Sequence, residues 1–265
     1  MNRILVVTYG LNKLSESTTI QSLVKWKSNL DNKLSLTIWN NGPTPINNDI
    51  QISMPIQIIE AQKNTELSKV YNFFVANFPG KKYLILDQDS KFCIDLLDNF
   101  NSKAHVILPK IIIGDKPIYP RLYPSNLFFL LKKNLPFSVK LNSSNMMSIG
   151  SGLMFSHALV LKILETHDNL FDERFSFYGV DTTFFLRLHK LENINVEIAQ
   201  SIIHDLSFSK KDLSIWKKQK KSSSVVCKLK YYPSFYHLML FLYASTFGIC
   251  YNKYDFKVLW KMRKK

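Results

Sequence analysis

The chain has 265 residues, of which 46% are hydrophobic, and its formal net charge is +15. This composition excludes a disordered chain and is enough for one substantial domain, or for one domain with an appendage. The three cysteines are too few and too far apart for a disulfide framework or a zinc cluster, so a reducing cytoplasm fits best and export is not expected.

Strands and helices alternate through the first part of the chain. Strands are predicted at Ile4–Thr8, Leu34–Trp39 and Gln57–Glu60, and the first two are closed by turn-forming residues. Helices are predicted after Ser15 and over residues 67–78, where apolar residues recur at helical spacing. This alternation predicts an α/β fold with a mostly parallel sheet.

The stretch YLILDQDS, at Tyr83–Ser90, places two aspartates at the end of a buried strand. Ligands of open α/β sheets bind beyond the carboxyl ends of the strands, so we expect Asp87 and Asp89 to face a cleft. Grouped carboxylates suit Mg²⁺ or Mn²⁺ carrying a diphosphate. By itself, however, an Asp-x-Asp pair is more often a solvated turn.

The second part of the chain is less regular. The connection from Ile111 to Asn145 is predicted to be partly structured. It is also predicted to line the acceptor side of the site, where the second substrate would bind. A strand with two glycines, which allow close approach of the backbone to a ligand, is predicted at Ser148–Phe155. The remaining predicted elements are an apolar segment at Ile94–Leu97, strands near Val106–Leu108, at Asn195–Ala199 and at Ser201–Ile203, and a helix from about His157 to Glu165.

A further helix is predicted to begin close to Asp181, which follows Gly179 and Val180. A carboxylate at the start of a helix is a candidate catalytic group. Asp is also favoured as a helix N-cap, however, for reasons unrelated to catalysis. The last predicted strand ends at His204 and Asp205.

The positive charge is concentrated after this strand. Residues 206–265 hold 14 of the 35 Lys and Arg residues but only 2 of the 20 Asp and Glu residues, a net charge of +12. Residues 235–251 form an apolar aromatic run that is marginal in length for crossing a bilayer. The run is interpreted either as an interfacial helix on an anionic membrane or as a helix that packs on the domain.

Taken in order, these motifs resemble the family-two inverting glycosyltransferases, especially rhamnosyl- and galactofuranosyltransferases of bacteria. The resemblance rests on ILVVTYG, IWNNGP, NTELSKVYN, YLILDQDS, SIGSGLMF, FDERFSFYGVDTTFFLRL and IIHDLSF, and it spans roughly residues 3–208. It implies the nucleotide-diphospho-sugar transferase (GT-A) fold, with a catalytic domain at 1–208 and a basic helical segment at 209–265. Two positions depart from the family pattern: Asn40 replaces an aspartate, and Glu66 replaces a glycine.

The resemblance also implies roles for individual residues. Asp89 is expected to be the main ligand of Mn²⁺ or Mg²⁺, with Asp87 touching the ribose or the metal, and His204 as a further ligand that favours Mn²⁺. Asp181 is expected to be the general base. The remaining candidates are Thr8, Tyr9, Asn40, Asn64 and Lys69 for the nucleotide-sugar, and Gly150, Ser151, Gly152, Asp172 and Glu173 for the acceptor side.

The predicted function is transfer of a sugar from a UDP- or dTDP-sugar to a hydroxyl of a glycan or lipid-linked glycan, as in O-antigen or capsule synthesis. The predicted location is the inner face of the plasma membrane, as a peripheral protein. One alternative is a nucleic-acid-binding protein that uses the basic segment, although no nucleic-acid-binding motif is present. Another is a sugar nucleotidyltransferase, but Gly10 is not followed by a glycine-rich phosphate loop. The oligomeric state is left open.

Overall fold

The computed structural model describes residues 1–25, 34–61, 63–122, 143–144, 146–204, 224–234, 237–239 and 241–242. The strands are β1 (Asn2–Thr8), β2 (Leu34–Asn40), β3 (Ile56–Glu60), β4 (Lys82–Asp87), β5 (Ser90–Phe92), β6 (Val106–Ile113), β7 (Lys116–Tyr119), β8 (Arg121–Leu122), β9 (Met146–Met147), β10 (Met154–Ser156) and β11 (Val196–His204). The helices are α1 (Thr18–Val24), α2 (Leu67–Asn77), α3 (His157–Leu164) and α4 (Val180–Leu188), with 3-10 helices η1 (Leu14–Glu16) and η3 (Ile94–Asn101).

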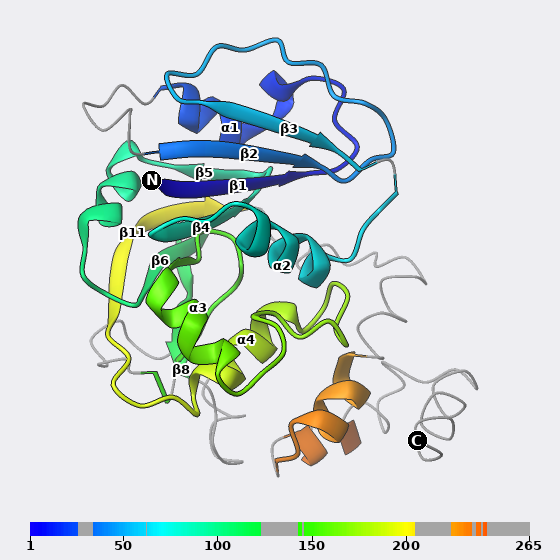
Figure 1. Ribbon diagram of the computed structural model, residues 1–265, viewed down its shortest axis with the longest axis vertical. Helices are drawn as coiled ribbons and strands as arrows, with labels where there is room; N and C mark the ends of the chain where they lie inside the picture. Colours follow the sequence, from blue (N-terminus) through cyan, green and yellow to red (C-terminus); the bar gives the residue numbers. More distant parts are fainter. Residues whose placement is uncertain are drawn as a thin grey trace.

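Within these ranges, nine strands form one sheet in the order β3-β2-β1-β4-β10-β6-β11-β5, with β7 beside β6 (Figure 1). The half made of β3, β2, β1 and β4 is parallel throughout, as the alternation of strands and helices predicts. The carboxyl ends of β1, β2 and β4 therefore lie side by side at one edge of the sheet.

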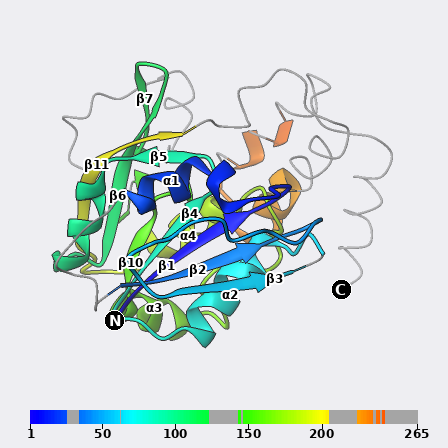
Figure 2. The same cartoon turned by 90° about the horizontal axis from the view of Figure 1, so that it is seen from above.

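The sheet separates two apolar layers, because neighbouring residues of a strand point to opposite faces. Leu5 and Ile85 belong to the layer covered by α2, α3 and α4, whereas Ile4 and Leu84 belong to the layer that contains α1 and η3. Figure 2 shows the same arrangement, with α1 on one side of the sheet and α2 and α3 on the other. Helices on both faces explain why β1 and β4 carry near-continuous apolar runs and why every residue of β2 is buried.

The predicted strand at Ser148–Phe155 is wrong in its extent. Only β10 is extended, and it runs antiparallel between β4 and β6. The residues before it turn sharply at Gly152, which has a φ of +84° and lies against Pro109 and Ile202 so closely that a Cβ would meet each at 2.5 Å. Only glycine fits at position 152, so Gly152 serves a change of chain direction.

The two short strands predicted at Asn195–Ala199 and Ser201–Ile203 are one strand, β11, which has a register shift between Ala199 and Ser201. Such a bulge keeps the ladder with β6 while re-aiming the end of the strand, where His204 lies. Most of the predicted acceptor-side connection, including the apolar and basic patch at residues 127–137, lies outside the described residues.

Part of the basic C-terminal segment joins the core. Residues 224–231 are helical, and Val226, Cys227 and Tyr232 are buried, the last two in the same layer as Phe184 of α4. This part of the segment packs on the domain (orange in Figure 1). None of the helices in the described ranges is both long and apolar enough to cross a membrane.

Candidate active site

The site is built at the sheet edge where β1, β2 and β4 end. Thr8 and Asn40 close β1 and β2, and they are linked through the amide of Asn41, which donates to the carbonyl of Thr8 at 2.8 Å. The turn after β4 is held from the other side by α1, because the Thr19 hydroxyl lies within hydrogen-bonding distance of the carbonyls of Asp87 and Ser90. The chain thus delivers Asp87 and Asp89 to a fixed position.

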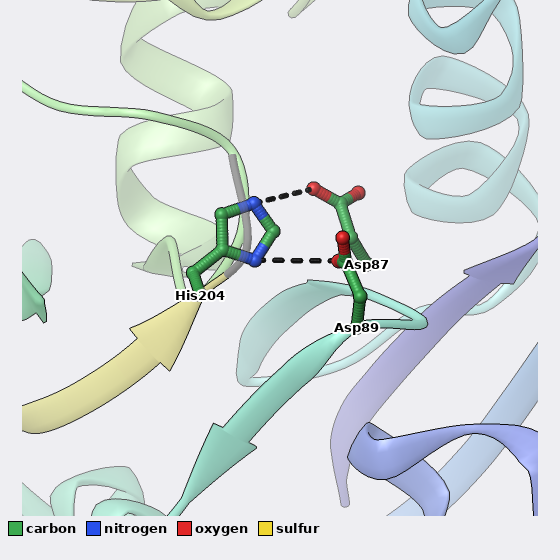
Figure 3. Close-up of side chains that lie close together, drawn as sticks. All are labelled: Asp87, Asp89 and His204. Atoms are coloured by element: carbon green, nitrogen blue, oxygen red, sulfur yellow. Dashed lines mark ion pairs between the residues drawn. The ribbon is translucent and has the colours of Figure 1, made fainter. Parts of the chain in front are cut away.

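Three predicted metal ligands converge there. Asp87, Asp89 and His204 each offer a ligand atom, and these atoms all lie within 4.8 Å of one another. His204 Nε2 is 3.8 Å from Asp87 Oδ2, and Nδ1 is 3.3 Å from Asp89 Oδ1, so the imidazole faces both carboxylates (Figure 3). The antiparallel pairing of β11 with β5 brings His204 opposite Ser90, one residue beyond Asp89.

The electrostatics of this cluster favour a bound cation. Burial, and then the neighbouring Asp89 carboxylate, raise the pKa of Asp87 to about 7. The Asp87 side chain is still 37% exposed, so water moderates this rise. Two carboxylates and an imidazole fit a Mn²⁺ or Mg²⁺ ion, which would relieve the repulsion between the carboxylates, and the imidazole favours Mn²⁺.

Two buried hydroxyl groups form a chain of hydrogen bonds between Asp87 and His204. The amide of Asp87 donates to Ser151 Oγ at 3.0 Å, Ser151 Oγ lies 2.5 Å from Ser90 Oγ, and Ser90 Oγ lies 3.0 Å from His204 Nδ1. Ser90 and Ser151 are both buried. These contacts connect the end of β4 to the imidazole and restrain the orientation of the ring.

We expect Ser151→Ala to lower the free energy of unfolding by about 1–3 kcal/mol, because it leaves the Asp87 amide without its side-chain acceptor and removes one of the two partners of the Ser90 hydroxyl. Ser148→Ala is the matched control: Ser148 is equally buried, but its hydroxyl has no hydrogen-bond partner in the described structure. The control should change stability by no more than about 0.5 kcal/mol. Urea denaturation of both variants measures this, and equal losses would show that the serine network does not hold the site.

Asp181 lies in the first turn of α4 and reaches the same site. The N-cap of α4 is Gly179, so Asp181 is not the helix cap that its position also allowed. Its carboxylate accepts a hydrogen bond from the amide of Gly150, and a Cβ at Gly150 would lie 2.7 Å from Oδ1. Burial, and then the charge on Asp87, raise the pKa of Asp181 to about 7. The candidate base and the candidate metal ligands are thus electrostatically coupled.

Tyr71 is a site residue that the sequence does not reveal, because its position in α2 reads as part of the apolar face. The residue is buried, and a Cβ at Gly150 would lie 3.6 Å from its hydroxyl oxygen. Burial, and then the charges on Asp87 and Asp181, raise its pKa well above the usual value. The Tyr71 hydroxyl therefore stays protonated as a hydrogen-bond donor near both carboxylates.

The predicted nucleotide-side residues lie around the ends of β1 and β2. Tyr9 is 50% exposed, and its amide donates to the Gln88 side chain at 2.6 Å. The Asn40 side chain is fully buried and donates to Thr44 O and to Glu60 Oε2, which fixes the turn. Glu60, at the end of β3, is a second residue of this region whose contacts the sequence does not reveal.

Two other predicted nucleotide-side residues are exposed. The side-chain oxygen Oδ1 of Asn64 accepts a hydrogen bond from the side-chain amide of Asn41 at 3.0 Å. This bond ties the segment before α2 to the turn after β2. Lys69 pairs with Glu66 at 2.8 Å, and this partner and then Glu173 raise its pKa. Lys69 is thus engaged with its own helix and with the loop that precedes α4.

Two predicted acceptor-side residues hold the loop before α4. Asp172 is 2% exposed and is paired with Arg174 at 2.5 Å and Arg187 at 3.5 Å. Although burial opposes the shift, hydrogen bonds from Arg174 and Tyr232 lower the pKa of Asp172. Glu173 accepts from the Asn72 side chain at 2.9 Å. Both carboxylates therefore position the segment that carries Asp181.

Comparison with known proteins relates the chain to others by structure alone. No protein-family model matches the sequence, and no curated protein matches it. Among solved structures, the chain is similar to S. aureus TarS 1-349, with a TM-score of 0.51 and 13% identity, over 87% of this chain and 72% of that one. The complex of TarS 1-349 with UDP gives a TM-score of 0.50 at 12% identity, with the same coverage of 87% and 72%. The fold is therefore the GT-A fold, as predicted from the motif order.

Proposed function

We propose that the protein is a metal-assisted glycosyltransferase that moves a sugar from a nucleotide-diphosphate donor to an acceptor hydroxyl. The observation that carries the proposal is the convergence of Asp87, Asp89 and His204 at the sheet edge, with the Asp181 carboxylate coupled to Asp87 and His204. The likeness of the fold to a protein solved with UDP supports a nucleotide-sugar as the donor.

Each group in the site has a chemical task in such a transfer. A divalent cation held by Asp87, Asp89 and His204 would neutralise the negative charge that grows on the departing diphosphate. The Asp181 carboxylate accepts the proton of the attacking hydroxyl, and burial, which raises its pKa, makes it a stronger base. The Gly150 amide holds this carboxylate in place.

We further propose direct displacement with inversion at the anomeric carbon. One carboxylate acting as a base is enough for a single displacement, and the motif order is similar to that of the family-two inverting enzymes, with rhamnosyl- and galactofuranosyltransferases as the nearest type. NMR of the product measures the outcome. A product with the anomeric configuration of the donor sugar would contradict inversion.

A turnover screen tests the function itself. The purified chain should release nucleoside diphosphate from one of a set of UDP- and dTDP-sugars in the presence of Mn²⁺ or Mg²⁺, with higher rates when a glycan or lipid-linked glycan acceptor is supplied. The reaction should stop when the metal is chelated and recover when Mn²⁺ is added. No release from any donor of the set, under conditions where the protein is folded, would contradict the proposal.

We propose that the protein is located at the cytoplasmic face of a membrane and binds anionic lipid there. Two features support it: the net charge of +12 in residues 206–265, and the exposure of Leu238 and Leu242, at 41% and 46%, one helical turn apart. Flotation with anionic liposomes should carry the full chain and leave behind a chain truncated after Tyr232, which keeps the buried helix. Equal partitioning of the two would remove the membrane proposal.

A further inference from the structure

The helix at residues 224–231 is fixed against α4 by buried contacts. Its Cys227 lies in the apolar layer of α4, and Tyr232, directly after the helix, joins two buried charges. The Tyr232 hydroxyl donates to Asp172 Oδ2 at 2.7 Å and accepts from Arg187 Nε at 3.2 Å. The basic segment therefore enters the domain at a defined position, beside the element that carries Asp181.

One face of this helix is turned toward the start of α4. Ser224 and Lys228, four residues apart and so on the same face, both lie against Gly179, the N-cap of α4. A Cβ at Gly179 would meet Ser224 Oγ at 2.6 Å and Lys228 Cε at 3.0 Å. Lys228 Nζ then reaches Thr182 Oγ1 at 3.4 Å, and Thr182 is the neighbour of Asp181. The lysine side chain thus crosses the first turn of α4.

We propose that Lys228 is a positioning residue of the active site, whose ammonium group supports the Asp181 carboxylate and makes the C-terminal helix part of the catalytic unit. The inference rests on the proposed function for its catalytic consequence. The charges around Asp181 agree with it: burial and Asp87 raise its pKa, whereas the Gly150 amide, Lys228 and His204 lower it. Among the described residues, Tyr71 of α2 is a further titratable group that interacts with Asp181, and it stays neutral.

Lys228→Met should therefore leave less of Asp181 ionised at neutral pH. We expect the rising limb of kcat against pH to move up by about one unit, so that kcat falls by up to about tenfold below the midpoint of the limb and recovers to within about twofold well above it. The donor KM should change by less than about twofold, and Lys228→Arg should restore the wild-type profile. Lys190→Met is the matched control. Lys190 is an exposed lysine just beyond the C-terminal end of α4, opposite to the end that carries Asp181, and its Nζ lies 5.9 Å from the centroid of the Tyr232 ring. An unshifted limb, or an effect confined to the donor KM, would overturn the inference.

A second measurement needs no turnover. In the metal-free protein the pKa of Asp181, about 7, lies well above the usual value of an aspartate, so its ionised form costs stability as the pH rises between these two values. Asp181→Asn should raise the melting temperature at pH 8, and by about 2–4 °C more in the Lys228→Met background than in the wild-type background. At pH 5 the two increases should be equal. Equal increases at pH 8 would refute the pairing even if transfer is found, whereas unequal increases without any transfer would refute the proposed function alone.

Discussion

Asp181→Asn is expected to lower kcat by about 10²- to 10⁴-fold, because the amide has the shape of the carboxylate but cannot accept the proton of the acceptor hydroxyl. Donor binding should persist, since the metal ligands lie at the ends of β4 and β11 and in the turn between β4 and β5, rather than on α4. Steady-state kinetics with the donor found in the screen, together with calorimetric binding of the nucleotide, measure the two effects separately.

The matched control for this variant is Asp98→Asn, which removes an exposed carboxylate on η3, in the opposite helical layer. It should keep kcat within about twofold of the wild type. If Asp181→Asn lost no more than a few-fold in kcat while its fold stayed intact, the proton would be taken by another group, and Asp181 would be a structural residue of α4.

Asp89→Asn is expected to weaken Mn²⁺ binding by at least about 100-fold, because it removes one of two carboxylates from a small ligand set. Electron paramagnetic resonance of free Mn²⁺ measures this without any substrate.

His204→Asn should reduce the affinity for Mn²⁺ more than that for Mg²⁺, since imidazole is a better ligand of the softer ion. Asp181→Asn, with its carboxylate outside the ligand set, should bind Mn²⁺ within a few-fold of the wild type. Unchanged Mn²⁺ affinity in both Asp89→Asn and His204→Asn would place the metal elsewhere.

The local pattern of the sequence predicted the parallel half of the fold because that half depends on local signals. Apolar runs closed by turn residues mark β1, β2 and β4, and Asp87 follows from its place at the end of a buried strand. The convergence of His204 on Asp87 and Asp89 is also as expected, since the motif order places it at the end of the last strand. The strand features need only the local pattern and the rule that parallel strands end together, whereas the place of His204 followed from the resemblance to the glycosyltransferase family.

Other features depend on contacts that no local pattern encodes. The stretch SIGSGLMF is predicted as a strand because it ends in an apolar run, yet the packing of Gly152 on Pro109 and Ile202 forces a turn before that run. Tyr71 lies on the apolar face of α2, so only the folded chain shows that its hydroxyl approaches Gly150. Lys228 is one lysine in a strongly basic segment, and nothing in its surroundings in sequence distinguishes it from its neighbours. Its place beside Thr182 arises from the burial of the adjacent Cys227 and of Tyr232, one turn further on.

The most direct test of the central claim is a crystal structure of the protein with Mn²⁺ and the donor, using anomalous scattering to locate the metal. We expect one manganese peak bound by Asp87, Asp89 and His204, with the anomeric carbon of the sugar between that ion and the Asp181 carboxylate. A manganese peak away from these three residues, or a sugar whose anomeric carbon faces away from Asp181, would contradict the account.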